Sequence, residues 1–177
     1  MAIAECEGWI ARDCDSFIEG DCDINVVACV VEGIGGSDAK GHHRDCFTVR
    51  LRDGHLEILP MPALPVALAN MAGARLGNTV FLVGGTLTPT DTTASRDLFS
   101  LDLERPADGW KRLEPIPGPG RILPVAAACG GGFHVVSGAS LAPDAADKPV
   151  RTYLKDGWVY RPGKGWSAMP DVPRAVV

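Results

Sequence analysis

The sequence predicts an all-β fold built from a repeated unit of four antiparallel strands. The first observation is a pattern that recurs three times: an apolar run ending in glycine, a polar loop, a third strand and a proline cluster. In the second and third copies, a fourth strand that begins at Gly-Trp precedes the proline cluster. The glycines Gly36, Gly85 and Gly138 lie 49 and 53 residues apart, and Trp110 and Trp166 lie 56 apart. A fixed period in this range indicates repeated supersecondary units. The second observation is that 21 Gly and 14 Pro are spaced regularly, as expected for many short strands and turns.

The central copy of the pattern shows the order of strands most clearly. Residues 69–75 and 79–85 are two apolar runs joined by a turn signal, Gly77-Asn78, which predicts a tight hairpin. A third strand over 98–103 alternates between apolar and polar residues. A fourth begins at Gly109-Trp110 and ends before a proline cluster, because proline cannot continue a strand ladder. Four antiparallel strands stacked radially form the blade of a β-propeller.

The repeat divides the chain into segments. The first 25 residues are acidic, rich in turn residues and without strand alternation, so they are expected to be a disordered or non-homologous extension. The first blade is partial because it lacks a recognisable inner strand, and the last five residues resemble the start of a further inner strand. The predicted division is an extension at 1–25, blades at 26–63, 64–117 and 118–172, and a strand start at 173–177.

Charge and hydropathy exclude several classes of protein. The net charge is −5 and the pI is about 5.3, which argues against a general binder of nucleic acid or of anionic membranes. No stretch approaches about 18 uninterrupted apolar residues, so no membrane-spanning segment is predicted. The N-terminus lacks the basic and apolar regions of a signal peptide. The chain as written is therefore expected in the cytoplasm, although a full-length parent could be periplasmic.

Neither a metal site nor a cofactor is predicted. The six cysteines (Cys6, Cys14, Cys22, Cys29, Cys46 and Cys129) contain no Cys-x2-Cys pair of the kind that zinc sites use, so free thiols are the better interpretation. The glycine pairs at Gly84-Gly85 and Gly130-Gly131 are not phosphate loops, because no Lys-Ser or Lys-Thr pair and no helix follows them.

Cationic side chains collect in the loops predicted to share one rim of the blades, so we expect an anion site on a protein that is acidic overall. The predicted ligand-binding residues are Arg44, Arg96, Arg121, Arg151 and His43; Lys40, His42, Lys148 and Arg174 belong to the same rim. An arginine fork matches a carboxylate bidentately, so a ligand that bears a carboxylate suits these residues.

A structural role for several of these residues is the alternative. Arg44-Asp45 and Arg96-Asp97 occupy equivalent places in the repeat, so these arginines can instead be part of its architecture, each pairing with an aspartate of the next blade. The same alternative holds for Arg121, Arg151 and Arg174. The adjacent His42 and His43 are either an acid–base couple or solvated loop residues.

The chain also resembles a known family at particular motifs. These are Gly33-Ile-Gly-Gly-Ser-Asp-Ala-Lys40 with His42-His43, Leu64 to Asn70, Gly118-Pro-Gly-Arg121, Arg151-Thr-Tyr-Leu154 and Pro173-Arg174. Together they resemble the kelch-repeat β-propellers, and within them the cyclically permuted mutarotase and N-acetylneuraminate epimerase (sialic-acid mutarotase) family. That resemblance implies a propeller of six blades, of which this chain would supply about three. It also implies a sugar acid as the small-molecule ligand.

One departure from the family bears on catalysis. In the family, a Gly-Glu…Gly-x-Arg motif in one loop carries the catalytic glutamate and a substrate arginine. The nearest loop here has Arg151 but has Ala139 in place of the glutamate, so the catalytic residue is unknown. Two hypotheses remain open: part of a sugar mutarotase that is not catalytic alone, and a non-catalytic kelch module that binds a carbohydrate or protein on its rim. A partial propeller exposes strand edges, so edge-to-edge homodimers or aggregation are also expected.

Overall fold

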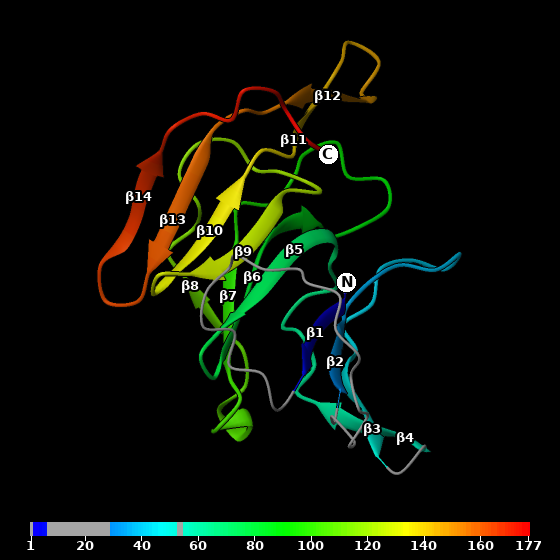
Figure 1. Ribbon diagram of the computed structural model, residues 1–177. Coiled ribbons are helices and arrows are strands. Elements are labelled where there is room, and N and C mark those ends of the chain that lie inside the picture. Colours follow the sequence, from blue (N-terminus) through cyan, green and yellow to red (C-terminus); the bar gives the residue numbers. More distant parts are fainter. Residues whose placement is uncertain (1, 7–28, 53–54) are drawn as a thin grey trace, which may run out of the picture.

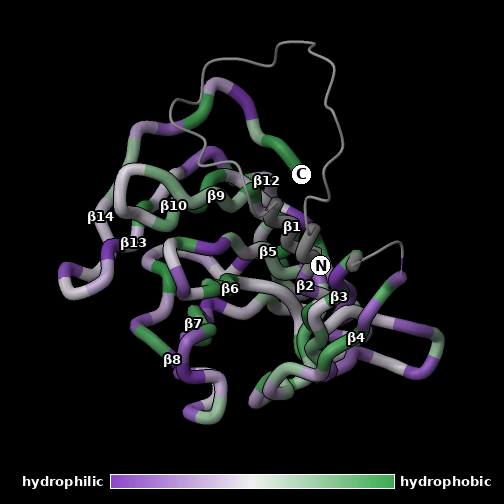
Figure 2. The backbone as a smooth tube through the Cα atoms, turned by 60° about the horizontal axis from the view of Figure 1, so that its bottom comes forward, coloured by the Kyte–Doolittle hydropathy of each residue, from purple (hydrophilic) through white to green (hydrophobic). Residues whose placement is uncertain are grey.

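The computed structural model describes residues 2–6, 29–52 and 55–177 and confirms the all-β prediction (Figure 1). Strands in these residues form three four-stranded antiparallel sheets and one two-stranded hairpin. The three sheets follow one another across the molecule in chain order, as the second view also shows (Figure 2). The second sheet lies between the other two, and each of its faces packs against a neighbouring sheet.

The first sheet has one strand more than the sequence predicts. It contains β1 (Ala2–Cys6), β2 (Cys29–Ile34), β3 (Cys46–Arg52) and β4 (His55–Met61), in that spatial order. The sequence places residues 1–25 outside the repeat, whereas the backbone of β1 pairs with β2 along its whole length, from Ala2–Gly33 to Cys6–Cys29. No two-residue turn links β1 to β2, which is why the hairpin signal was absent. Residues 7–25 lie outside the described residues.

The second sheet contains β5 (Ala69–Leu76), β6 (Thr79–Thr86), β7 (Leu98–Asp102) and β8 (Lys111–Leu113). The predicted hairpin at Gly77-Asn78 is confirmed: Leu76 pairs with Thr79, and Gly77 has a positive φ of 59°. A short 3-10 helix, η1 (Pro106–Asp108), precedes β8. Nowhere in the described part of the chain is there a helix long and apolar enough to cross a membrane.

The third sheet contains β9 (Val125–Cys129), β10 (Gly132–Val136), β13 (Gly157–Arg161) and β14 (Gly165–Met169). Between its second and third strands the chain forms a separate hairpin, β11 (Ala139–Pro143) with β12 (Pro149–Tyr153). The sequence did not predict these two strands, because the loop between the apolar run at β10 and the aromatic strand at β13 lacks a clear alternation.

The same backbone hydrogen bonds recur at equivalent places in the three sheets. The N–H after each apolar run donates to an aspartate carbonyl at 2.9–3.1 Å, and the next N–H donates to a residue that approaches from the following connection at 2.8–3.1 Å. The first set is Gly35 to Asp45, Gly84 to Asp97 and Ser137 to Asp156; the second is Gly36 to Leu68, Gly85 to Arg121 and Gly138 to Val176. Leu68, Arg121 and Val176 are therefore structurally equivalent, and so are Gly35, Gly84 and Ser137.

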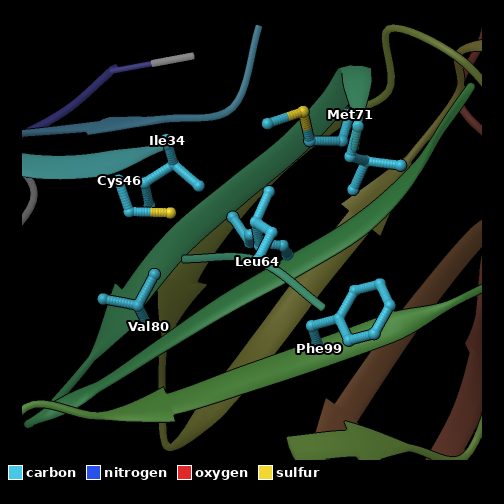
Figure 3. Close-up of a cluster of buried hydrophobic side chains, with 8 residues drawn as sticks. Ile34, Cys46, Leu64, Met71, Val80 and Phe99 are labelled. Atoms are coloured by element: carbon cyan, nitrogen blue, oxygen red, sulfur yellow. The ribbon is translucent and has the colours of Figure 1, made fainter. Parts of the chain in front are cut away.

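Two apolar layers hold the sheets together. The layer between the first and second sheets contains Ile34, Cys46, Leu64, Leu68, Met71, Val80, Leu82 and Phe99 (Figure 3). The layer between the second and third contains Phe81, Val83, Leu98, Ile116, Phe133 and Val135, with Trp158, Tyr160 and Trp166 packed against it. Phe81 and Phe133 stack across this second layer with ring centroids 5.4 Å apart. Stacked sheets bury their apolar faces in this way, and the packing fixes the positions of the connections between the strands.

Candidate functional site

Three connections leave the sheets at the same end of the molecule and form its candidate rim. They are the β2–β3 connection (35–45), the β6–β7 connection (87–97) and the hairpin of β11 and β12 (Figure 1). The repeated backbone bonds fix where each connection starts, because the residue after every apolar run is tied to the residue before the third strand. Functional side chains on these connections are thus placed by the repeat itself.

A polar cluster lies where the first and second sheets meet at the rim. His42 Nε2 is 3.1 Å from Thr86 Oγ1, and His42 Nδ1 is 3.0 Å from Ser37 Oγ. Asn70 Nδ2 donates to the same Thr86 hydroxyl at 3.3 Å. Thr86 is buried, whereas Asn70 is exposed and His42 is half-buried. Ser37, His42, Asn70 and Thr86 therefore form one polar cluster. In it, the buried hydroxyl of Thr86 contacts the half-buried imidazole of His42 and the exposed amide of Asn70.

Asp91 on the β6–β7 connection adds a carboxylate beside this cluster. It accepts hydrogen bonds from the backbone N–H groups of Leu87 at 2.7 Å and Thr88 at 3.0 Å, and from the Thr88 hydroxyl at 2.5 Å. Partial burial opposes its ionisation, but these hydrogen bonds, with a smaller contribution from the charge of His42, lower the pKa of Asp91 below its usual value. Asp91 is thus an ionised residue that orders its own loop.

An open hollow of about 600 Å³ lies next to the third sheet. Its lining residues are Leu123, Arg151, Tyr153, Ala175 and Val177. Arg151 and Tyr153 lie on β12 and are exposed, with Tyr153 at 60% of its surface. The hollow combines one guanidinium, one phenol and an apolar wall. This combination suits a ligand that has both a carboxylate and a non-polar face.

The polar cluster and the hollow are joined through the backbone. The N–H of Leu123, which lines the hollow, donates to the carbonyl of Asn70, which belongs to the cluster, at 2.7 Å. Both residues have positive φ, 59° for Asn70 and 51° for Leu123. Asparagine is enriched in this region of backbone space, but leucine is not, so the conformation of Leu123 is held by its surroundings. One backbone hydrogen bond therefore links the hollow to the polar cluster.

Arg44 and Arg96 have equivalent contacts in the first and second sheets. The Nε of Arg44 donates to the carbonyl of Leu64 at 2.6 Å, and the Nε of Arg96 donates to the carbonyl of Ile116 at 3.0 Å. Both side chains are otherwise exposed. Their Nε atoms serve the repeat architecture, although through a carbonyl group and not through the aspartate of a neighbouring blade.

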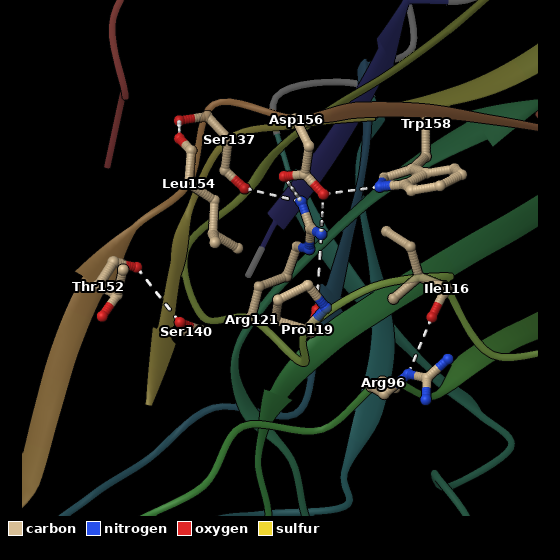
Figure 4. Close-up of polar contacts among 10 residues, drawn as sticks. All are labelled: Arg96, Ile116, Pro119, Arg121, Ser137, Ser140, Thr152, Leu154, Asp156 and Trp158. Carbon is tan, nitrogen blue, oxygen red and sulfur yellow. Dashed lines mark hydrogen bonds and ion pairs between the residues drawn. The ribbon is translucent and has the colours of Figure 1, made fainter. Parts of the chain in front are cut away.

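Arg121 requires a correction. It was predicted among the ligand-binding arginines, but its side chain has no exposed surface. Its Nη1 and Nη2 donate to Asp156 at 2.9 and 2.8 Å, and Nη1 also donates to the carbonyl of Ser137 at 3.1 Å (Figure 4). The nearest opposite charge is therefore already supplied by the protein, so Arg121 is a framework residue.

The environment of Asp156 favours its ionised form. Partial burial raises its pKa, but hydrogen bonds from Arg121 and from Trp158 Nε1 at 2.7 Å, with the charge of Arg121, outweigh burial and lower the pKa below its usual value. The Arg121–Asp156 pair therefore remains charged at neutral pH. It ties the connection that follows β8 to the start of β13.

The remaining predicted residues are separated on the rim. His43 Nε2 lies 3.2 Å from Asp38 Oδ2, so this histidine contacts its own loop, and His42 takes the place in the polar cluster. Arg151 lies in the hollow. Ala139, at the position where the family motif requires a glutamate, is buried and pairs with Ile122. Sequence reasoning missed Asn70 and Thr86; only the tolerance of asparagine for positive φ hinted at a special role for Asn70.

The arrangement can orient a polyhydroxylated anion. Arg151 can donate hydrogen bonds to a carboxylate, while Asn70, Thr86 and His42 offer donors and acceptors for hydroxyl groups. Among the four side chains of the cluster, His42 is of the type that general acid–base catalysis uses most often. Among the described residues, no three His, Cys, Asp or Glu side chains are grouped so that they could hold a metal ion.

Comparisons with known proteins point to one group of enzymes. No protein-family model matches the chain. It is 34% identical over 109 residues to an N-acetylneuraminate epimerase of Brucella suis, a match that covers 61% of this chain and 26% of that protein. It is 30% identical over 118 residues to one of Haemophilus influenzae (66% and 28%), and 33% identical over 102 residues to one of Pasteurella multocida (57% and 24%). The matches span about a quarter of the length of these curated relatives. Over that part, the chain is a distant homologue of N-acetylneuraminate epimerases.

Proposed function

We propose that the chain is part of a kelch-type β-propeller that binds a sugar acid, N-acetylneuraminate or a close analogue, on its rim. The observation that carries the proposal is the hollow lined by Arg151 and Tyr153, which the Leu123–Asn70 hydrogen bond links to the polar cluster of His42, Asn70 and Thr86. The names of the homologous enzymes support the substrate class. A complete protein containing this segment would act as a sugar mutarotase.

We further propose that this segment does not catalyse mutarotation alone. Mutarotation requires a group that moves protons at the ring oxygen and the anomeric hydroxyl, held in register with the bound sugar. The position expected to hold a glutamate is Ala139, which is buried and carries no proton-transfer group. His42 is held between Ser37 and Thr86 and is not among the residues that line the hollow. The second candidate function is a non-catalytic module that binds a carbohydrate. Ala139 favours it, because the side chain at this position cannot transfer a proton.

Binding can be tested with the 177-residue chain and N-acetylneuraminate, using saturation-transfer NMR and titration calorimetry. The methyl ester of the same sugar serves as a probe that lacks the carboxylate charge. Arg151→Ala is expected to weaken binding at least tenfold, because a charge-assisted bidentate contact is lost. Lys164→Ala removes one positive charge from the β13–β14 turn and is the matched control, with unchanged affinity expected.

The results separate the two parts of the proposal. Absence of binding at millimolar sugar, or equal affinity of the wild type for the acid and its ester, would contradict the proposed ligand. Equal losses for Arg151→Ala and Lys164→Ala would contradict the proposed place of the carboxylate. Anomer exchange measured by NMR is expected to run at the uncatalysed rate, and an accelerated rate would show that the segment is catalytic by itself.

A further inference from the structure

A second hollow, of about 350 Å³, lies between the first and second sheets, away from the rim. Residues of the β5–β6 turn and of the β7–β8 connection line it, and both leave the strands at the end opposite the rim connections, where η1 is seen (Figure 1). Four charged side chains line this space, which we call the inter-sheet hollow: Glu32, Arg50, Arg75 and Glu104. None of them belongs to the polar cluster or to the hollow at the rim.

The repeat shows that a charge in this space is exceptional. Glu32 pairs with Thr48 at the place where, one sheet later, Phe81 pairs with Ser100. Phe81 is 3% exposed and stacks on Phe133 with ring centroids 5.4 Å apart. Glu32 is equally buried, at 2% exposed, but it brings a carboxylate to the equivalent interface. Between the first and second sheets the repeat therefore replaces aromatic packing with an ionisable group.

A carboxylate at such depth is costly unless charged or polar groups surround it, and the second sheet supplies them. Arg75 Nη1 lies 3.9 Å from Glu32 Oε1. The guanidinium of Arg75 is held in place, because its Nε donates to the carbonyl of Gly77 at 2.8 Å and its Nη2 to Asn78 Oδ1 at 3.2 Å. The amide of Asn78 in turn donates to the carboxylate of Glu104. The polar wall of the inter-sheet hollow is thus ordered by contacts within the protein.

The opposite wall combines one guanidinium with apolar side chains. Arg50 on β3 is exposed and lines the inter-sheet hollow, and no hydrogen bond or ion pair joins it to another residue of the described part of the chain. Leu59, Met61 and Leu103 line the same space. The four charged residues are two acids and two bases, so their formal charges cancel. A ligand with one charge of each sign matches such a site better than a simple anion or cation does.

We propose that the inter-sheet hollow binds a small zwitterion, a free α-amino acid with an aliphatic side chain. Its carboxylate would pair with Arg50, whose fork matches a carboxylate, and its ammonium group with Glu32. Its side chain would lie against Leu59 and Met61. A volume of about 350 Å³ falls at the lower end of the range for ligand pockets and suits a molecule of this size. The site is separate from the rim, so the proposal does not depend on sugar binding.

Three related compounds test the charge requirement with the 177-residue chain, by titration calorimetry and saturation-transfer NMR. L-Leucine carries both charges, leucinamide lacks the carboxylate, and N-acetyl-leucine lacks the ammonium group. Leucine is expected to bind at millimolar concentration or below, and each blocked analogue about tenfold more weakly, because one charge-assisted contact is lost. No binding of leucine at millimolar concentration would overturn the proposal. Equal affinity for leucine and either analogue would overturn the zwitterion as the ligand.

Two substitutions then assign the charges. Arg50→Gln should abolish the preference for leucine over leucinamide, and Glu32→Gln should abolish the preference for leucine over N-acetyl-leucine. Each result is a ratio of affinities within one variant, so a partly unfolded sample does not change it, and circular dichroism checks the fold. Arg161→Gln is the matched control, because Arg161 has the equivalent place in the third sheet and lies outside the inter-sheet hollow. Its preferences should equal those of wild type. An Arg50→Gln variant that still prefers leucine to leucinamide would refute the assigned place of the carboxylate.

Discussion

Arg121 and Asp156 form a bidentate ion pair, with distances of 2.9 and 2.8 Å from the two terminal nitrogens of the arginine to the two carboxylate oxygens. The guanidinium is fully buried, while the carboxylate keeps 29% of its surface exposed. The equivalent positions in the neighbouring repeats hold Leu68 and Val176, so one repeat replaces an apolar residue with a charge. Removing one partner of such a pair leaves an uncompensated charge, so the pair stabilises the fold only while both partners are present.

Arg121→Met is therefore expected to destabilise the chain strongly. Removing one partner of a buried pair typically costs 3–5 kcal/mol, and about 3 kcal/mol is expected here because Asp156 can be partly hydrated once it is unpaired. Arg96→Met is the comparison: it removes a single, partly buried neutral-acceptor contact to the carbonyl of Ile116, for a loss of about 1 kcal/mol. Urea unfolding followed by tryptophan fluorescence measures both. Equal losses would show that the Arg121 pair is not buried as described.

The same pair makes stability depend on pH in acid. The pKa of Asp156 is lowered by folding, so its contribution is fully present above the ordinary value of 3.8 and is lost as the pH falls through the lower pKa of the folded state. Wild type should lose stability below about pH 4 more steeply than Asp156→Asn. Asp171→Asn, at an exposed site, is the control. Unfolding midpoints between pH 2.5 and 7 give the slopes, and parallel curves for wild type and Asp156→Asn would refute this account.

Ser137 is the non-glycine member of the set formed with Gly35 and Gly84, and it keeps their positive φ, at 60°. Its hydroxyl accepts from the N–H of Val176 at 2.6 Å and donates to the carbonyl of Leu154 at 2.8 Å. In the second repeat, where the position is Gly84, the corresponding groups bond directly, from Arg121 N–H to the Ser95 carbonyl at 3.2 Å. The serine hydroxyl is thus inserted into a bond that the other repeats make without it.

Because the hydroxyl bridges two backbone groups, two small substitutions of Ser137 are expected to change the free energy of unfolding by different amounts. Ser137→Gly relieves the backbone strain and permits the direct bond, so its free energy of unfolding should stay within about 1 kcal/mol of wild type. Ser137→Ala keeps the strain and leaves two backbone groups without the bridging hydroxyl, at a cost of about 1–3 kcal/mol. Chemical denaturation distinguishes the two. An alanine variant as stable as the glycine variant would mean that the hydroxyl bridge contributes nothing.

The sequence could predict those features that depend on local periodicity and could not predict those that depend on distant pairing. The hairpin at Gly77-Asn78 was predictable because turn chemistry is local. The strand β1 was not predictable, because no local sequence pattern indicates that Ala2–Cys6 pairs with β2. His42 meets Thr86 across 44 residues, and Arg121 meets Asp156 across 35. The sequence does not show whether an arginine in a rim loop contacts a ligand or a carboxylate of the protein. Only the fold could therefore distinguish the framework role of Arg121 from the exposed position of Arg151.

Gly120 provides a last prediction, about how closely the connections pack. A Cβ atom built on Gly120 would lie 2.0 Å from the carbonyl oxygen of Ala94, a backbone atom that cannot move aside. Gly120→Ala must therefore push the approach to β9 away from the β6–β7 connection, and we expect a loss of about 2–3 kcal/mol with weakened sugar binding. The control is Gly130→Ala, where φ is +53° but a Cβ would meet nothing within 4 Å, so the cost is limited to about 1 kcal/mol of backbone strain. Thermal unfolding and the NMR binding assay measure both effects. If Gly120→Ala proved as mild as Gly130→Ala, the two connections could not be in the close contact that holds the rim together.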